Sequence, residues 1–257
     1  MIIYRICIPS YRRANLIRER TLRLLNNYNV PKELIDIIVE TEDMKNEYIK
    51  SIGSDYNIIV SNTKGVGQKR NFVRRYYQQE TDVKYLVCLD DDLLQILDMD
   101  KPIECFDDFE KIILRGFDEC EKHQCDLWGV SPLTNPFFMK RKVSSNLKYI
   151  CGAMFGLIID RSVPPIQTQF DHCEDMEFCL QHFLRDDAVI RLNWICFKHE
   201  YFVDNGGITT YCGSVAERKK EAEINCKKLA SMYPDMVKYT TNKWGSSIKF
   251  NWRYKNP

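Results

Sequence analysis

Short apolar runs alternate with helical stretches through the first third of the chain. These runs have the length and the apolar content of buried strands. They are Ile2–Ile8, Ile35–Val39, Asn57–Val60 and Tyr85–Leu89. Helical periodicity appears between them over Asn15–Leu25 and Gln68–Gln79. This alternation is typical of βαβ units, so the sequence predicts an α/β fold with a mostly parallel central sheet flanked by helices.

The same pattern continues, with longer gaps, toward the carboxyl terminus. Strands are predicted over Leu127–Val130, Tyr149–Ile159 and Ile190–Lys198, and helices over Phe106–His123 and Asp175–Leu184. A capping-box match at Ser214–Glu217 opens a further helix that runs to about Tyr233, before Pro234. With no repeat and no linker, we expect a catalytic domain over residues 1–213 and a basic helical extension, residues 214–257, packed on the same domain.

Composition limits the class of protein. The 257 residues are 44% hydrophobic, enough for one large core, and no run of 18 apolar residues occurs. The sequence therefore predicts no membrane segment and no signal peptide, and a cytoplasmic location, or the host cytoplasm or nucleus for a viral protein. The eleven cysteines are spread out, as in reduced proteins. The residues that could be proposed as zinc ligands are Cys120, Cys125, His172, Cys173, Cys179 and His182. They lack paired C-x₂-C spacing, so no zinc site is predicted.

Charge is unevenly distributed along the chain. Residues 214–257 carry ten Lys and Arg against four acids, a net charge of +6, whereas the remainder carries −5. A basic segment on an acidic body indicates a polyanionic partner, and a solvated helix face is the alternative.

Polar side chains follow four successive strands of the predicted sheet. They are Pro9-Ser10-Tyr11-Arg12, Glu40, Lys64–Gly67 and the triplet Asp90-Asp91-Asp92. In an open α/β sheet, the carboxyl ends of the strands form the ligand-binding crevice. Carboxylates there suit Mg²⁺ or Mn²⁺ bridging to substrate phosphates, as in an enzyme that binds a nucleotide diphosphate. Taken alone, the triplet is compatible with a solvated acidic turn.

In the order of these motifs, the chain resembles the glycosyltransferases of the GT-A fold over residues 2–205. The resemblance implies that Pro9, Ser10, Tyr11, Arg12 and Glu40 hold the base and ribose of a nucleotide sugar. Lys64-Gly65-Val66-Gly67-Gln68-Lys69-Arg70-Asn71 resembles the family's Gly-x-x-x-x-Arg-Asn stretch, which implies donor-binding roles for Lys64, Gly65, Gln68, Arg70 and Asn71. The planar guanidinium of Arg70 suits a carboxylate of the metal site or a phosphate.

The triplet itself resembles the family's Asp-x-Asp motif. By that resemblance Asp92 binds Mn²⁺ or Mg²⁺, Asp90 faces the ribose or sugar, and Asp91 lies beside the donor. His199 stands where many of these enzymes place a further metal ligand, although a lone histidine is more often structural. Gly152, in a strand with small residues, suits a wall close to the donor sugar or, equally, tight strand packing.

A second acidic pair, Glu174-Asp175, resembles the pair that opens a helix below the acceptor in inverting members. There Asp175 would take the proton from the acceptor hydroxyl, with Glu174 as its partner. The alternative is that both acids favour a helix N-terminus through the helix dipole.

Within the fold, the chain is similar to the glycosyltransferases associated with TET/JBP-type base hydroxylases, which modify hydroxymethylated pyrimidines in DNA. The similarity rests on residues 64–71, the Asp triplet, Glu174-Asp175 and Asn205-Gly206-Gly207-Ile208. It implies a UDP-sugar donor, UDP-glucose above all, and a DNA acceptor. DNA contacts would come from Lys140, Arg141 and Lys142 and from the basic carboxyl-terminal segment, whose aromatic residues could instead form a strand packed on the core.

Three alternatives remain open. A glycosyltransferase acting on a glycan, a lipid carrier or a protein would show no salt-sensitive DNA binding. A nucleotidyltransferase also uses Asp pairs and a Gly/Lys/Arg loop, but that loop is expected after the first strand rather than the third. A non-catalytic binding module would bind nucleotide without turnover.

Overall fold

The computed structural model describes residues 4–199, 207–242 and 245–256. Ile2 and Ile3 of the first predicted strand, together with Asn205, Gly206 and Trp244, lie outside the described residues. No helix in the described part of the chain is long and apolar enough to cross a membrane.

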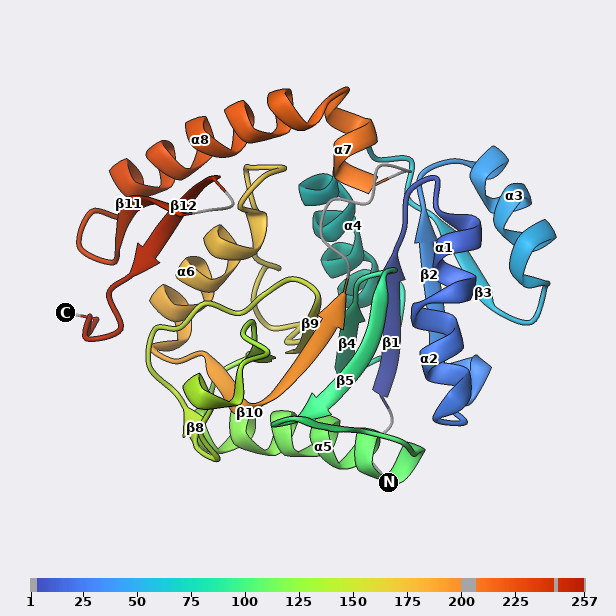
Figure 1. The fold of residues 1–257 in the computed structure, drawn as a ribbon, viewed down its shortest axis with the longest axis horizontal. Helices are drawn as coiled ribbons and strands as arrows, with labels where there is room; N and C mark the ends of the chain where they lie inside the picture. The colour runs from blue at the N-terminus through green and yellow to red at the C-terminus, as the bar shows by residue number, and fades with distance from the viewer. Residues whose placement is uncertain (1–3, 200–206, 243–244, 257) are drawn as a thin grey trace.

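Ten strands of the described residues form one sheet, in the order β3-β2-β1-β4-β9-β7-β10-β5-β6, with β8 paired to β10 (Figure 1). The four strands from β3 to β4 are parallel, β9 is antiparallel to both of its neighbours, and β7 and β10 are parallel. The predicted α/β class is therefore confirmed. The strands are β1 (Tyr4–Pro9), β2 (Ile35–Val39), β3 (Asn57–Val60), β4 (Tyr85–Leu89), β5 (Leu93–Asp98), β6 (Lys101–Pro102), β7 (Leu127–Ser131), β8 (Val143–Ser144), β9 (Met154–Ile158) and β10 (Ile190–His199).

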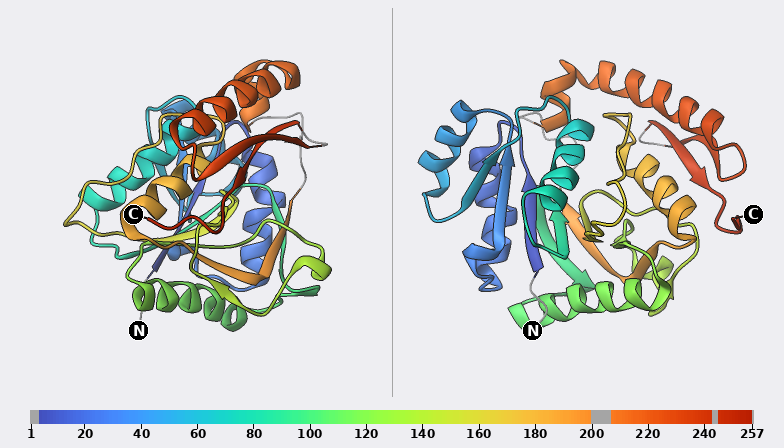
Figure 2. Two further views of the ribbon diagram at one scale, coloured as in Figure 1. Left: turned by 90° about the vertical axis from the view of Figure 1, so that its left-hand side faces the viewer. Right: turned by 180° about the vertical axis from the view of Figure 1, so that it is seen from behind.

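Helices cover both faces of this sheet, and a hairpin of β11 (Val237–Asn242) and β12 (Gly245–Phe250) lies beside α8 (Figure 2). The helices are α1 (Ala14–Glu19), α2 (Thr21–Asn27), α3 (Glu42–Ile52), α4 (Val66–Gln79), α5 (Phe106–His123), α6 (Glu174–Asp186), α7 (Gly207–Cys212) and α8 (Val215–Met232). Short 3₁₀ turns occur at Lys32–Leu34 and Pro136–Phe138.

Two apolar cores follow from the alternation of side chains along the strands. In β1, Ile6 and Ile8 face a core shared with α1, α2, α3 and α5, whereas Cys7 faces a core shared with α4, α6 and α8. Strand β4 divides in the same way, with Val87 on the first side and Leu86 on the second. A strand that is apolar at every position is thus explained by burial on both faces.

Local chemistry accounts for the elements that the sequence placed differently. The acidic stretch after β2 begins helix α3, because Thr41 accepts a hydrogen bond from the Met44 N–H and Glu42 and Asp43 suit the helix N-terminus. The predicted helix over residues 15–25 is two helices that meet at Arg20. The predicted strand over residues 149–159 pairs only over Met154–Ile158, and β5 follows the Asp triplet directly.

Candidate active site

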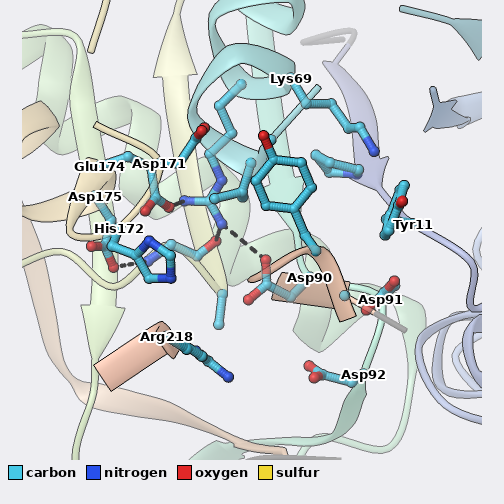
Figure 3. Close-up of a pocket in the computed structure, with 18 of the residues that line it drawn as sticks. Tyr11, Lys69, Asp90, Asp91, Asp92, Asp171, His172, Glu174, Asp175 and Arg218 are labelled. Atoms are coloured by element: carbon cyan, nitrogen blue, oxygen red, sulfur yellow. Dashed lines mark hydrogen bonds and ion pairs between the residues drawn. The ribbon is translucent and has the colours of Figure 1, made fainter. Parts of the chain in front are cut away.

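A cleft of about 380 Å³ lies at the carboxyl ends of β1, β2 and β4 and is also lined by residues of α7 and α8 (Figure 3). Thirteen of the residues that the sequence predicted for the site line this cleft. They are Pro9, Ser10, Tyr11, Glu40, Gly65, Arg70, Asp90, Asp91, Asp92, Gly152, Glu174, Asp175 and His199. The topology thus gathers side chains that lie up to 190 residues apart in the sequence.

The Asp triplet occupies a tight turn between β4 and β5. The hydroxyl of Thr21 shapes this turn, since it donates to the Asp90 carbonyl at 2.7 Å and accepts from the Leu93 N–H at 3.0 Å. The break between α1 and α2 places Thr21 at the start of α2, where it can make both bonds. Asp90 pairs with Arg70, whereas Asp91 and Asp92 share Arg13.

Asp91 is the most enclosed of the three carboxylates. Its Oδ1 lies 2.9 Å from Nη1 of Arg13, and its Oδ2 accepts a hydrogen bond from the hydroxyl of Ser10. Burial raises the pKa of Asp91, and Arg13 opposes that shift. A carboxylate held in this way positions the turn.

Asp92 has a different environment. Its Oδ2 lies 3.3 Å from Nη1 of Arg13, while its buried Oδ1 accepts no hydrogen bond from the described residues. Nδ1 of His199 is 3.7 Å from that oxygen, because the antiparallel register pairs His199 with Leu93. An imidazole beside a buried carboxylate oxygen is a donor set that suits Mn²⁺. The residues present therefore fit a divalent ion at Asp92 and His199.

Arg70 connects the two acidic motifs of the cleft. Its Nη2 pairs with Asp90 Oδ1 at 3.0 Å and donates to the Gly152 carbonyl at 3.1 Å, and its Nη1 pairs with Glu174 Oε1 at 2.9 Å (Figure 3). A Cβ at Gly152 would lie 2.0 Å from Nη1, so only glycine leaves room for the guanidinium. Burial raises the pKa of Asp90 to about 7 and that of Glu174 to about 8, and Arg70 opposes both shifts.

The amino end of α4 is closed by Asp171. Gly65 has a φ of +86°, and the Gly67 N–H donates to Asp171 Oδ1 at 2.9 Å. A Cβ at Gly65 would lie 2.4 Å from this carboxylate. The two glycines therefore let the acid approach the positive end of the helix closely.

Lys69 and Tyr11 form another part of the lining beside Glu40. The Lys69 ammonium donates to the Ser10 carbonyl at 2.9 Å and lies 5.2 Å from the centre of the Tyr11 ring. Burial lowers the pKa of Lys69 to about 8, with Glu40 opposing. Oε2 of Glu40 is buried and accepts no hydrogen bond from the described residues. An aromatic face with one donor and one acceptor suits a planar heterocycle.

Asp175 is held at the first turn of α6. Its Oδ2 accepts from the Tyr149 hydroxyl at 2.5 Å and from the Gly152 N–H at 3.1 Å, and its Oδ1 accepts from the Met176 N–H. Glu174 and Asp175 thus have separate partners: Glu174 is paired to Arg70, and Asp175 is bound by neutral donors.

The remaining predicted residues lie away from the cleft lining. Lys64 and Gln68 are exposed, Arg12 has a φ of +53° and contacts the Tyr11 ring, and Asn71 is buried in hydrogen bonds with Thr168. The neighbour of Arg12, Arg13, is the residue that reaches the Asp triplet.

Lys140, Arg141 and Lys142 are exposed near the far end of β5. Arg141 pairs there with Asp98, and Asn193 donates to the Lys142 carbonyl. Asn193 lies six residues before His199 in β10, so this basic loop is about 20 Å from the metal-binding end of the strand.

Several lining residues were not predicted. They are Arg13, Val66, Lys69, Cys151, Ala153, Asp171, His172, Cys173, Gly207, Tyr211, Arg218, Lys219, Ala222 and Ser246. Figure 3 shows Arg218 extending from α8 toward the space in front of Asp92, and burial lowers its pKa. The sequence does contain a signal for Arg218. Helical spacing places it on the same face of α8 as Ala222, Cys226 and Leu229, and the last two of these are buried. A cation on the apolar face of a helix is unusual and marks Arg218 as a candidate.

The chain is similar in fold to several solved structures. The mannosyltransferase PcManGT from Pyrobaculum calidifontis, solved with GDP-Man and Mn²⁺, is similar with a TM-score of 0.51 and 12% identity, over 89% of this chain and 64% of that one. Glucosyl-3-phosphoglycerate synthase from Mycobacterium tuberculosis, solved with Mn²⁺, UDP-glucose and phosphoglyceric acid, gives a TM-score of 0.51 and 11% identity over 99% and 89%. S. aureus TarS 1-349 is similar with a TM-score of 0.47 and 12% identity, over 88% of this chain and 65% of that one.

At these identities the solved structures show the fold, which is that of the GT-A glycosyltransferases. The chain spans less than two thirds of the length of TarS 1-349 and of PcManGT. No curated protein sequence matches the chain. A family model described as TET-Associated Glycosyltransferase matches residues 4–207, which is most of the chain. The chain therefore belongs to the TET-associated glycosyltransferase family.

Proposed function

We propose that this protein is a metal-dependent, inverting glycosyltransferase that moves a sugar from a UDP-sugar to the hydroxymethyl group of a pyrimidine in DNA. One observation carries the donor half of this proposal. Each triplet carboxylate has one oxygen paired to an arginine, but Asp92 also has a second, buried oxygen beside His199 that accepts no hydrogen bond from the described residues.

Asp92 and His199 would hold the ion, Mn²⁺ or Mg²⁺. When bound, the ion offsets the charge that develops on the departing diphosphate. Arg218, on the opposite side of the cleft, would add a second positive charge facing the same group. Mn²⁺ accompanies the nucleotide sugar in both PcManGT and the M. tuberculosis synthase, which supports a metal-dependent donor site here.

The base of the nucleotide would stack on Tyr11. The Lys69 ammonium, 5.2 Å from the centre of that ring, and the buried oxygen of Glu40 supply one donor and one acceptor in the same part of the cleft. A uracil edge carries both an N–H and carbonyl groups, so it matches this pair. UDP-glucose in the M. tuberculosis synthase favours the same donor class, and GDP-Man in PcManGT leaves a guanine nucleotide as the alternative.

Asp175 is our candidate for the base. Its carboxylate would take the proton of the acceptor hydroxyl as that oxygen bonds to the anomeric carbon and the bond from that carbon to the diphosphate breaks. The Tyr149 hydroxyl and the Gly152 N–H fix its orientation. Glu174 is less suited, because its pairing with Arg70 occupies its oxygen and because burial raises its pKa to about 8.

A DNA acceptor is supported by the family and by charge. The family description associates these enzymes with TET proteins, and residues 214–257 carry a net charge of +6. A duplex is long enough to contact both the cleft and the basic loop about 20 Å away. A glycan, a lipid carrier or a protein is the alternative acceptor.

A donor-by-acceptor screen tests the proposal. Labelled UDP-sugars are combined with Mn²⁺ and with hydroxymethylcytosine DNA, hydroxymethyluracil DNA or unmodified DNA, and label on the DNA is counted. We expect label only where the hydroxymethyl base is present. Release of UDP without label on any DNA would move the acceptor to another class, and the absence of UDP release would refute the donor assignment.

A further inference from the structure

A second cluster of metal-binding groups lies beside the cleft, where the segment before α6 meets α7 and α8. His172, Cys212 and Glu221 each offer one ligand atom, and these atoms lie within 4.8 Å of one another. His172 is 6% exposed, although its ring also lines the cleft. Neither Asp92 nor His199 takes part, so this cluster is separate from the Mn²⁺ or Mg²⁺ site proposed above.

The distances within the cluster suit a small tetrahedral ion. Cys212 Sγ lies 3.3 Å from Nε2 of His172. A tetrahedral zinc ion, with Zn–S near 2.3 Å and Zn–N near 2.0 Å, holds its sulfur and nitrogen donors roughly 3.5 Å apart. The pair is therefore already close to the separation that the ion requires.

The third group can complete the set with little movement. Glu221 Oε2 lies 3.1 Å from Nδ1 of His172, yet that buried nitrogen makes no acceptable hydrogen bond to the described residues. The Glu221 side chain is 54% exposed, so its carboxylate can turn toward the sulfur. It can then bind the ion directly or orient the imidazole, as carboxylates do for metal-bound histidines.

The surrounding charge favours a cation. Three carboxylates, those of Glu221, Asp171 and Glu217, lie close enough to act electrostatically on Cys212, against one guanidinium, that of Arg218. Within the cluster itself, Glu221 supplies one negative charge, which a bound cation would offset.

We propose that His172, Cys212 and Glu221 form a zinc-binding site that joins the loop before α6 to α7 and α8. The thiol of Cys212 loses its proton to solvent as its sulfur bonds to Zn²⁺, and a water molecule completes the tetrahedron. Both sites combine an imidazole with a carboxylate, but the thiolate of Cys212 is a soft ligand that favours zinc over the harder Mn²⁺ and Mg²⁺. From the sequence no zinc site was predicted, and of these three ligands only His172 was among the candidates, because the ligands lie 40 and 9 residues apart.

Such a site would hold α7 and α8, which line one side of the cleft, in place against the segment before α6. His172 precedes Glu174 and Asp175 by two and three residues, and Arg218 lies three residues before Glu221 on α8. Bound zinc would therefore keep the distance between Arg218 and the two acids of α6, Glu174 and Asp175, constant. This predicts that zinc raises the melting temperature and slows proteolysis within α7 and α8.

The test measures zinc binding on the full chain. Protein purified under reducing conditions is equilibrated with Zn²⁺ and dialysed, and bound zinc is counted by mass spectrometry, with affinity measured by a chromogenic chelator. Cobalt is used as a second probe, because a thiolate ligand gives it a charge-transfer absorption band. Cys212→Ser and Glu221→Gln alter the least buried ligands. The matched controls are Cys173→Ser, beside His172, and Cys105→Ser, an exposed thiol elsewhere.

We expect one zinc per chain, a cobalt–thiolate band, and an affinity that falls roughly 10-fold to 100-fold in Cys212→Ser and in Glu221→Gln. Asp92→Asn and both control variants should keep the zinc. Wild-type binding in Cys212→Ser, loss of zinc in Cys173→Ser, or no binding by the wild-type chain at micromolar zinc would each overturn the assignment. None of these results depends on glycosyl transfer.

Discussion

The two walls of the cleft are built from different kinds of structure. One wall consists of the ends of β1, β2 and β4 and the first turns of α4, where Asp91 and Arg70 are buried and each makes at least two polar contacts within the wall. The other consists of helices α7 and α8, where Tyr211 is 41% exposed and Lys219 is exposed. The sheet wall is therefore fixed by its own bonds, whereas the helical wall presents exposed side chains at Tyr211 and Lys219.

The walls also differ in charge. The sheet wall presents the carboxylates of Glu40 and the Asp triplet together with the cations Arg13, Lys69 and Arg70, whereas the helical wall presents Arg218 and Lys219. A donor diphosphate bound between them would meet a metal on one side and guanidinium on the other. This division suggests that the sheet wall supplies the preorganised chemistry and the helical wall supplies adjustable charge, and each of the following substitutions tests one side of it.

The largest effect is expected at the sheet wall, at Asp92. Asp92→Asn should lower metal-dependent transfer at least about 1000-fold, because the amide cannot supply the anionic ligand. Initial rates of UDP release would measure this loss, with circular dichroism showing an unchanged fold. Asp98→Asn, at the other end of the same strand, is the control and should keep full activity. Substantial turnover in Asp92→Asn would remove this residue from the metal site.

The next largest effect is expected at Arg70, whose ion pairs with Asp90 and Glu174 should contribute to the stability of the fold. Arg70→Ala leaves the carboxylates of Asp90 and Glu174 without their guanidinium, at a cost of about 3–5 kcal/mol in the free energy of unfolding. Urea denaturation measures that cost. Arg75→Ala, which removes a half-buried arginine of the same helix, should cost far less. A loss below about 1 kcal/mol in Arg70→Ala would mean that the sheet wall does not depend on these ion pairs.

Asp175 tests the acceptor side of the cleft. Asp175→Asn should slow transfer about 100-fold or more while leaving the dissociation constant for the UDP-sugar unchanged, because a base acts on the acceptor proton rather than on the donor. Rapid-quench rates and isothermal titration measure the two quantities. Asp187→Asn, at the far end of α6, serves as the control. If turnover is unaffected, another carboxylate, such as Glu177, must take the proton.

Prediction from sequence succeeded where the site follows from strand order and failed where it follows from helix packing. Asp90 to Asp92 and Glu40 come directly after strands, so βαβ topology alone sends them to one edge. Arg218 reaches the cleft only because Cys226 and Leu229, two and three turns later, dock α8 on the core. That docking depends on tertiary contacts that no local pattern specifies.

The sequence also could not predict which of two neighbouring residues points into the cleft. Arg12 was expected at the donor, but its left-handed backbone turns it onto Tyr11 and brings Arg13 to the Asp triplet. Asn71 was expected at the nucleotide, yet it binds Thr168 on the loop that precedes α6. A motif gives the neighbourhood of a site, and the direction of each side chain depends on backbone angles that the motif does not fix.

Arg218 measures how much the helical wall contributes. Arg218→Gln should lower transfer about 10-fold, because one cation facing the diphosphate is lost while the metal site is intact. The salt dependence of DNA binding should stay as in the wild type. Lys228→Gln, an exposed cation of the same helix, is the matched control and should leave turnover unchanged. If DNA affinity falls and donor turnover does not, α8 belongs to the acceptor surface instead of the cleft.

The smallest effect is expected outside both walls, at the basic loop. Lys140→Gln combined with Lys142→Gln should weaken DNA binding only a few-fold and reduce the slope of log affinity against log salt by up to about 2, one phosphate contact for each lysine. Filter binding at several salt concentrations measures the slope, with Lys45→Gln combined with Lys50→Gln on α3 as the control. UDP release in the absence of DNA should be unchanged, because about 20 Å of β10 separates this loop from His199. A lower rate of UDP release without DNA would mean that the loop acts on the cleft, and the separation between donor site and acceptor surface would fail.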